Sequence, residues 1–168
     1  MFISTRSTAL ILGVLGAATL STPAFADTVS SSLGVSAKVT ANCTVSTTAL
    51  DFGSVNTLSA SAVDGTGGVT VTCTNGSPWA ASADAGTGSG ATLATRRLTS
   101  GGNALNYSLY TNAARTSVWG DGTGSTATVA NTGSGAAQSF TVYGRIPGGQ
   151  ASAPAGTYGD TVSVTITY

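Results

Sequence analysis

The stretch that decides the fold runs from Thr28 to Cys43 and reads Thr28-Val-Ser-Ser-Ser-Leu-Gly-Val-Ser-Ala-Lys-Val-Thr-Ala-Asn-Cys43. Every even position is polar or glycine, and every odd position except Ser31 is apolar. Side chains alternate across a β-strand with period two, so the pattern predicts one long amphipathic strand. From Thr28 to Thr40, at about 3.3 Å per residue, it would span roughly 43 Å, against a usual strand of about five or six residues. A long, one-sided strand near a chain end can extend another molecule's sheet as readily as its own.

The first 26 residues have the layout of a secretory signal. Arg6 supplies the positive start, Ala9 to Leu20 form an apolar core, and Ala24-Phe25-Ala26 is a small-x-small cleavage site. The apolar core is too short to span a bilayer. We therefore predict an exported chain that begins at Asp27, and its remaining 142 of 168 residues suit one domain.

Composition excludes several classes of partner and favours an all-β fold. Removal of Arg6 leaves five basic residues against six aspartates, a net charge of −1. A nucleic-acid binder would need a basic face and a polybasic membrane binder a lysine cluster, and the sequence has neither. The chain has no glutamate, one lysine and 23 glycines, with abundant Thr, Ser and Val, which favours strands and turns over helices.

The two cysteines, Cys43 and Cys73, predict one disulfide in an exported domain. On the chain-entropy model a loop of this size contributes roughly 3–4 kcal/mol. The alternative is two free thiols. A disulfide would anchor the base of the N-terminal strand to the sheet, so that everything before Cys43 could move without unfolding the rest of the domain.

After Cys43 the chain is a series of short β-like runs separated by glycine clusters. The runs are Leu50–Val55, Val69–Cys73, Trp79–Ala83, Asn106–Tyr110, Ser139–Arg145 and Gly159–Tyr168. The predicted turns are Asp64–Gly68, Gly86–Gly90, Gly101–Gly102, Gly120–Gly124 and Gly148–Gly149. This spacing predicts a two-sheet sandwich. In the last run the even positions Val162, Val164, Ile166 and Tyr168 are apolar, so both ends of the mature chain are one-sided strands.

The sequence offers little that could carry catalysis. It contains no histidine, which removes Ser-His-Asp arrangements, imidazole bases and most zinc sites. Asp-Gly-Thr-Gly, at Asp64 and at Asp121, resembles the aspartic-protease motif loosely, and Asp-Gly is a common hairpin turn. We therefore predict no enzyme activity, no catalytic or metal-binding residues and no cofactor. Five aromatic residues could line a sugar-binding surface, but in a small sandwich they favour the core; these are Trp79, Trp119, Tyr107, Tyr110 and Tyr143.

An ordered set of segments resembles the spore coat protein U domain, the fold unit of archaic chaperone–usher pilins. The segments are Cys43-Thr-Val45, Leu50-Asp-Phe-Gly53, Val69-Thr-Val-Thr-Cys73, Asn106-Tyr-Ser-Leu-Tyr-Thr-Asn-Ala-Ala-Arg115, Val118-Trp-Gly120, Tyr143-Gly-Arg145, Pro154-Ala-Gly156 and Tyr158–Tyr168. They cover essentially the whole mature chain, and the stretch from Gly86 to Ala94 matches least.

The resemblance implies an incomplete immunoglobulin-like sandwich that lacks its last strand. A periplasmic chaperone lends a strand to cover the gap, and an outer-membrane usher exchanges it for the N-terminal segment of the next subunit, either another copy or a sister pilin. Residues 1–26 would then be the signal peptide, 27–41 the donor segment and 42–168 the sandwich. The donor residues would be Val29, Leu33, Val35, Ala37 and Val39, and the edge of the gap would be formed by Val162, Val164 and Ile166.

Four functions compete on these grounds. The first is a pilus subunit that polymerises by donor-strand exchange into a surface fibre for adhesion and biofilm formation. A tip adhesin would need no donor strand and would usually carry a second domain, for which this chain has no room. A secreted coat or matrix protein of the same fold, with the strand folded back on its own sheet, stays open. A secreted hydrolase is disfavoured by the missing histidine and the scattered carboxylates.

Overall fold

The computed structural model of the chain describes residues 25–168, and the ordered elements in this range are eight β-strands. Most of the predicted signal peptide lies outside the described residues. The strands are β1 (Cys43–Thr48), β2 (Val63–Cys73), β3 (Pro78–Ala83), β4 (Arg96–Ser100), β5 (Asn103–Tyr110), β6 (Val129–Thr132), β7 (Ala137–Ile146) and β8 (Val164–Thr167). The predicted all-β class is confirmed.

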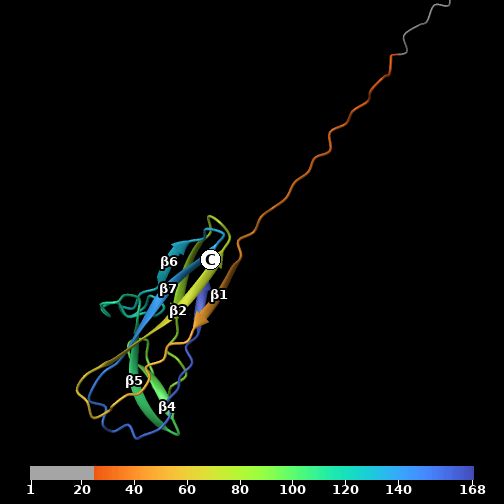
Figure 1. The fold of residues 1–168 in the computed structure, drawn as a ribbon. Coiled ribbons are helices and arrows are strands. Elements are labelled where there is room, and N and C mark those ends of the chain that lie inside the picture. The colour runs from red at the N-terminus through yellow and green to blue at the C-terminus, as the bar shows by residue number, and fades with distance from the viewer. Residues whose placement is uncertain (1–24) are drawn as a thin grey trace, which may run out of the picture. The chain divides into compact units, whose positions relative to one another are not determined.

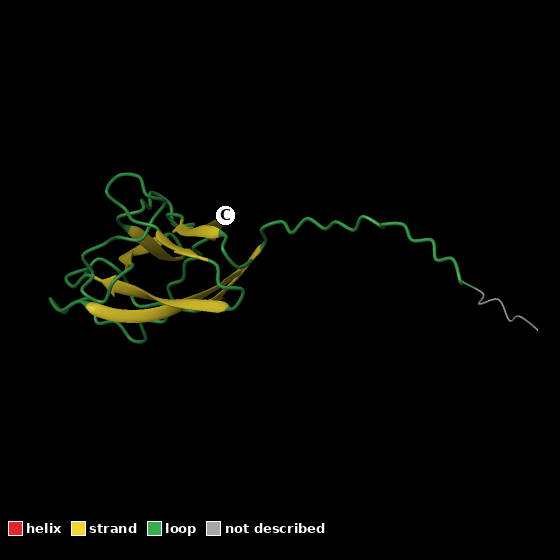
Figure 2. Cartoon of the chain, turned by 90° about the horizontal axis from the view of Figure 1, so that it is seen from above, coloured by secondary structure: helices red, strands yellow, loops and turns green. Residues whose placement is uncertain are grey.

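The strands form two antiparallel sheets in separate layers (Figures 1 and 2). One sheet has the order β1-β2-β7-β5-β4 and the other the order β6-β3-β8. The predicted two-sheet sandwich is therefore confirmed, and it occupies the compact unit Lys38–Tyr168. Residues 25–42 belong to neither sheet, because a strand needs a ladder of hydrogen bonds to a neighbour and, in the described structure, only Asn42 at the end of this segment is bonded to the sandwich, through Thr74.

The core comes from period-two alternation on facing strands. Alternate residues of β2, β3, β5 and β7 are buried, while those between them face outward or are half-buried. The buried apolar residues of these strands are Val69, Val71, Cys73, Trp79, Ala81, Ala83, Leu105, Tyr107, Leu109, Val142 and Ile146. Trp119 joins them from a loop and donates its Nε1–H to the carbonyl of Ala81 at 3.1 Å. Three of the five aromatic residues considered above are thus core residues, while Tyr110 and Tyr143 are half-buried on an outer face.

Two predictions for the first third of the chain are wrong, for one shared reason. Asp64–Gly68 is part of β2 rather than a turn, and Leu50–Val55 forms no strand. Gly65 and Gly67 lie on the inward face of β2, where they leave space above the sheet. Leu50 and Phe52 fill it: a Cβ at Gly65 would lie 3.1 Å from atoms of both side chains. The glycines that suggest a turn therefore make room for core side chains from another segment.

The remaining differences concern edge strands. No strand was predicted for β1, β4 or β6, which are short edge strands with mostly exposed or half-buried residues and weak apolar alternation. The last strand is shorter than Gly159–Tyr168, although its predicted parity holds at Val162, Val164 and Ile166, which are half-buried. Tyr168 is the exception, because its side chain is exposed. The Gly101–Gly102 turn is confirmed: both residues have positive φ, which suits a two-residue hairpin between β4 and β5.

Cys43 and Cys73 form a disulfide that joins the first residue of β1 to the last residue of β2. The two residues are direct partners in the antiparallel register of these strands. The chain between them closes a loop with a sequence separation of 30. The predicted disulfide is therefore confirmed, and the base of the N-terminal segment is covalently tied to the sandwich.

We expect protease digestion of the mature protein under non-reducing conditions to release the Cys43 and Cys73 peptides as one linked species. Mass spectrometry before and after reduction measures this directly, and the same spectra give the N-terminal residue, expected to be Asp27. Alkylation of either cysteine without prior reduction would contradict the disulfide. A first residue other than Asp27 would contradict the predicted cleavage site, and a start beyond Val29 would also remove one of the predicted donor residues.

Candidate functional site

The sandwich is open along one side, between the edge strands β1 and β8. Among residues 25–168, each of these strands has a hydrogen-bonded neighbour on one side only, β2 for β1 and β3 for β8. The inward face of β1 is poorly covered, since Val45, opposite the buried Val71, leaves 42% of its surface exposed. An added strand would pair with the free backbone edges of β1 and β8 and would cover the apolar face between them.

Two cavities lie along this open side. One of about 390 Å³ is lined by Thr47–Leu50 on one wall and by Asp160, Thr161, Val162 and Val164 on the other, with Val69, Leu109, Trp119 and Val142 among its floor residues. The second, of about 630 Å³, is lined by Leu50–Leu58 and Ala153–Tyr158, with Leu105 and Ile146 beneath. The two walls run in opposite chain directions past both cavities. We call the two cavities together the groove.

Three side chains, Leu50, Phe52 and Leu98, line both cavities and so mark where they meet. We call these three residues the constriction. Leu50 and Phe52 are fixed from below by inward-facing glycines, because a Cβ at Gly144 would lie 2.8–3.0 Å from their atoms. Phe52 also packs edge-on against Tyr107, with ring centroids 6.0 Å apart. The constriction is therefore a tightly packed boundary between the two cavities.

The wall that precedes β8 is held by carboxylates together with a few backbone hydrogen bonds at Gly159 and Ser163. Asp160 accepts hydrogen bonds from the Thr87 amide and hydroxyl, both at 2.8 Å, and from the Tyr107 hydroxyl at 2.7 Å. Asp84 accepts hydrogen bonds from the amides of Gly86 and Ser163, each at 2.9 Å. These bonds fix residues 160–163 at the edge of the groove without any added strand.

Burial and hydrogen bonding shift the pKa values of Tyr107 and Asp84 in and beside this wall. Burial, followed by the Asp160 hydrogen bond, raises the pKa of Tyr107, so the phenol stays protonated and donates. Burial alone would raise the pKa of Asp84, but the hydrogen bonds from Ser163 and Gly86 outweigh it and the pKa is lowered. Below both lies the fully buried Arg96, whose guanidinium donates to the carbonyls of Asp84, Leu93 and Trp119. Sequence analysis missed this network, because its members are far apart in the chain.

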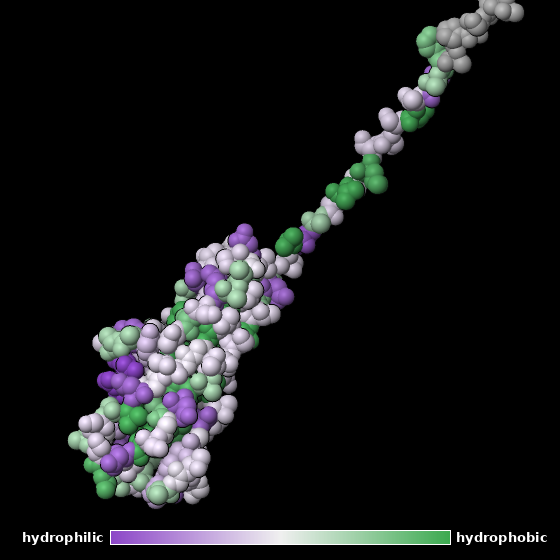
Figure 3. All heavy atoms as spheres, in the orientation of Figure 1, coloured by the Kyte–Doolittle hydropathy of each residue, from purple (hydrophilic) through white to green (hydrophobic). Residues whose placement is uncertain are grey.

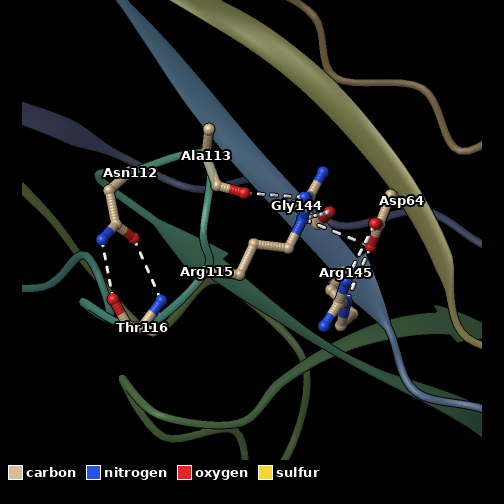
Figure 4. A network of polar contacts seen from close by, with 7 residues as sticks. All are labelled: Asp64, Asn112, Ala113, Arg115, Thr116, Gly144 and Arg145. Carbon is tan, nitrogen blue, oxygen red and sulfur yellow. Dashed lines mark hydrogen bonds and ion pairs between the residues drawn. The ribbon is translucent and has the colours of Figure 1, made fainter.

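A second polar cluster includes Asp64 of β2 and Arg145 of β7, whose positions in the alternating burial pattern put them on the outward face of the larger sheet; Figure 4 shows its contacts. Arg145 donates to both carboxylate oxygens of Asp64, at 2.7 and 2.9 Å, and Arg115 approaches the same group at 3.2 Å. The hydrogen bonds from Arg145 are the main reason that the pKa of Asp64 is lowered. Arg115 also donates to the Ala113 and Gly144 carbonyls, so the cluster fastens the loop after β5 to β7. The first Asp-Gly-Thr-Gly stretch is thus part of an ion-pair cluster within β2.

The residues predicted to form the groove edge lie at different points along the open side. Val162 and Val164 line the 390 Å³ cavity, and Ile166 packs against the core one step further along β8. The predicted donor residues Val29, Leu33, Val35 and Ala37 lie in the unit that ends at Ala37, and Val39 lies at the start of the unit that contains the sandwich. Their side chains are almost fully exposed, with Val29 at 98% and Leu33 at 88%. Figure 3 shows these apolar residues separated by polar ones along the segment. Their role as a donor strand stays a prediction.

Neither a metal site nor a membrane-spanning helix is found in residues 25–168. No group of three or more His, Cys, Asp or Glu side chains in this range could hold a metal ion. The same range contains no helix with the length and apolarity to cross a bilayer.

Comparisons with known proteins bear on the fold and the family. Among solved structures, the fold resembles a chain from the CsuC-CsuE chaperone-tip adhesion subunit pre-assembly complex from archaic chaperone-usher Csu pili of Acinetobacter baumannii. The TM-score is 0.52 at 20% identity, and the match covers 77% of this chain but 40% of that one, so this chain spans two fifths of its neighbour. A search of curated proteins finds no match. The family model of the Spore Coat Protein U domain matches residues 29–165, and the chain belongs to this family.

Proposed function

We propose that the protein is a structural subunit of a chaperone–usher pilus that polymerises by donor-strand exchange. Residues 27–41 of one copy form the donor segment, and residues 42–168 of the next form the acceptor sandwich. The observation that carries this proposal is the open side between β1 and β8, which lacks one strand in a chain that also has an exposed, alternating segment. The fibre reaches the cell surface, where it serves adhesion and biofilm formation.

The exposed groove is the reason that a chaperone and an usher are part of the proposal. Uncovered apolar floor and unpaired edges would make the free subunit prone to aggregate, so a periplasmic chaperone covers them first. The similar structure from Acinetobacter baumannii is a chaperone–subunit complex before assembly, which supports this partner. An outer-membrane usher then presents the covered groove to the donor segment of the next subunit. No nucleic acid takes part.

The estimated free energies of burial and association allow strand exchange, but burial of the donor side chains alone does not favour one capped state over the other. Burial of Val29, Leu33, Val35 and Val39 at about 1.5–3 kcal/mol each gives roughly 6–12 kcal/mol, as an upper estimate. The added backbone hydrogen bonds contribute further. Association costs about 4–15 kcal/mol. The direction of exchange is therefore set by the difference between the chaperone-capped and subunit-capped states.

We expect Leu33→Asp and Val35→Asp to abolish fibre formation, while Ser36→Asp assembles. A charge on the apolar face must enter the groove unpaired, at a cost of several kcal/mol, whereas a charge on the polar face stays in water and costs less than about 0.5 kcal/mol. Fibre yield on cells and the amount of chaperone-bound subunit in the periplasm are the measurements. Subunit levels should be normal for all three variants. Equal tolerance of charge on both faces would contradict insertion into a groove.

Appending a second copy of Thr28–Thr40 after Tyr168 through a flexible linker should give a stable monomer. The unmodified mature chain, expressed without its chaperone, should aggregate or polymerise because its sandwich lacks a strand. Size-exclusion chromatography and urea unfolding distinguish the two. If the unmodified chain is already a cooperative, stable monomer, the protein is better described as a secreted coat or matrix protein.

A further inference from the structure

We propose that the donor segment enters the groove in one register, with Ala37 at the constriction and Lys38 beside Asp51 of the acceptor. This inference rests on the proposed function and adds to it the residues that fix how the two copies align. Two separate features of the chain, one of size and one of charge, together select this alignment.

The size argument starts from the constriction between the two cavities. Leu50, Phe52 and Leu98 line both, so an inserted strand meets cavity, constriction and cavity in turn. The apolar face of the donor segment has three small residues, Ser31, Ala37 and Ala41, and Ala37 is the one that lies between two valines, Val35 and Val39. With Ala37 at the constriction, its neighbours on the same face fall on either side of it. A two-residue shift would press a valine against side chains that the interior glycines already hold tightly.

The charge argument uses different residues. The groove lining includes two carboxylates, Asp51 and Asp160, and no lysine or arginine. Both oxygens of Asp160 already accept hydrogen bonds. Asp51 is exposed, and only one of its oxygens accepts a hydrogen bond, from the Gly53 amide, in the described part of the chain. Asp51 is therefore the carboxylate that is free to pair with a cation from the donor.

Lys38 is the only basic residue of the donor segment, and it follows Ala37 directly. Placing Ala37 inward at the constriction turns Lys38 outward, because neighbouring strand residues face opposite sides. Asp51 lies between the constriction residues Leu50 and Phe52 in the chain, so Lys38 reaches the rim at the level of Asp51. Size requires a small residue at the constriction, and the charge pair selects Ala37 among the three small residues of this face, because Lys38 is its neighbour.

The unpaired edge of β8 fixes the direction of the strand. Residues 29–35 have to lie along Val164–Thr167, which offers regular strand hydrogen bonds, rather than along Ala153–Tyr158, which contains Pro154 and forms no strand. Leu33 and Val35 then enter the 390 Å³ cavity, and Val39 enters the 630 Å³ cavity.

The monomer with the appended Thr28–Thr40 copy allows the register to be tested in one chain. We compare leucine at two inward positions of the appended copy, Ala37→Leu and Val35→Leu, by urea unfolding. A leucine at the constriction is overpacked, so Ala37→Leu should shift the unfolding equilibrium constant in the destabilising direction by about 5- to 100-fold more than Val35→Leu. The reverse order would place residue 35 at the constriction and overturn the register.

The charge pair is tested by reversal in the same monomer. Lys38→Asp in the appended copy and Asp51→Lys should each destabilise, and the two together should recover about two- to five-fold at low salt. The recovery should shrink at about 1 M NaCl, where the screening length is about 3 Å. As a matched control, Ser36→Asp combined with Asp51→Lys should recover less.

The possible outcomes distinguish a failure of the proposed register from a failure of the proposed strand donation. A parent monomer that folds, with no coupling between residues 38 and 51, overturns the register and leaves strand donation intact. A parent that fails to fold as a monomer overturns strand donation, and the register with it.

Discussion

Leu50 and Phe52 pack above three inward-facing glycines, and the shape of the open side depends on this contact. Gly65, Gly67 and Gly144 leave the larger sheet without side chains at one place, and the segment after β1 fills that place. As a result the chain leaves the sheet after Thr48 instead of continuing as an edge strand. Two cavities remain on either side of the filled region, and together they form the groove.

The groove stays ordered although the strand that would complete it is not part of the sandwich. An ordinary sheet edge is held by its ladder, but residues 159–163 are held by backbone pairing between Thr99 and Gly159 and by the carboxylates of Asp84 and Asp160. The fully buried Arg96 supports the same region from below by donating to three carbonyls. Polar groups of the chain itself therefore position this wall, and the edge of the groove is in place without an added strand.

Period-two patterns predicted the parts of the fold in which burial follows the local sequence. They located the cores of β2, β3, β5 and β7, the inward face of β8 and, with the cysteine count, the disulfide. They failed at Leu50–Val55 and Asp64–Gly68, where the outcome depends on packing between segments that are distant in the chain. The buried Arg96 was missed for the same reason, since its partners become neighbours only in the folded sandwich. Strand parity put Val162 and Val164 on one apolar face, and the resemblance to the pilin domain then implied that they border the groove; both line the 390 Å³ cavity.

The disulfide also determines how the sandwich carries a mechanical load. A pull on the N-terminal segment enters the sandwich at Asn42, whose amide and carbonyl are bonded to Thr74, and at Cys43. From Cys43 the force passes through a covalent bond to Cys73 at the end of β2, a strand paired along its length with β7. The edge strand β1 is thereby bypassed, so the tension is borne by the two central strands and not by the ladder that would shear first.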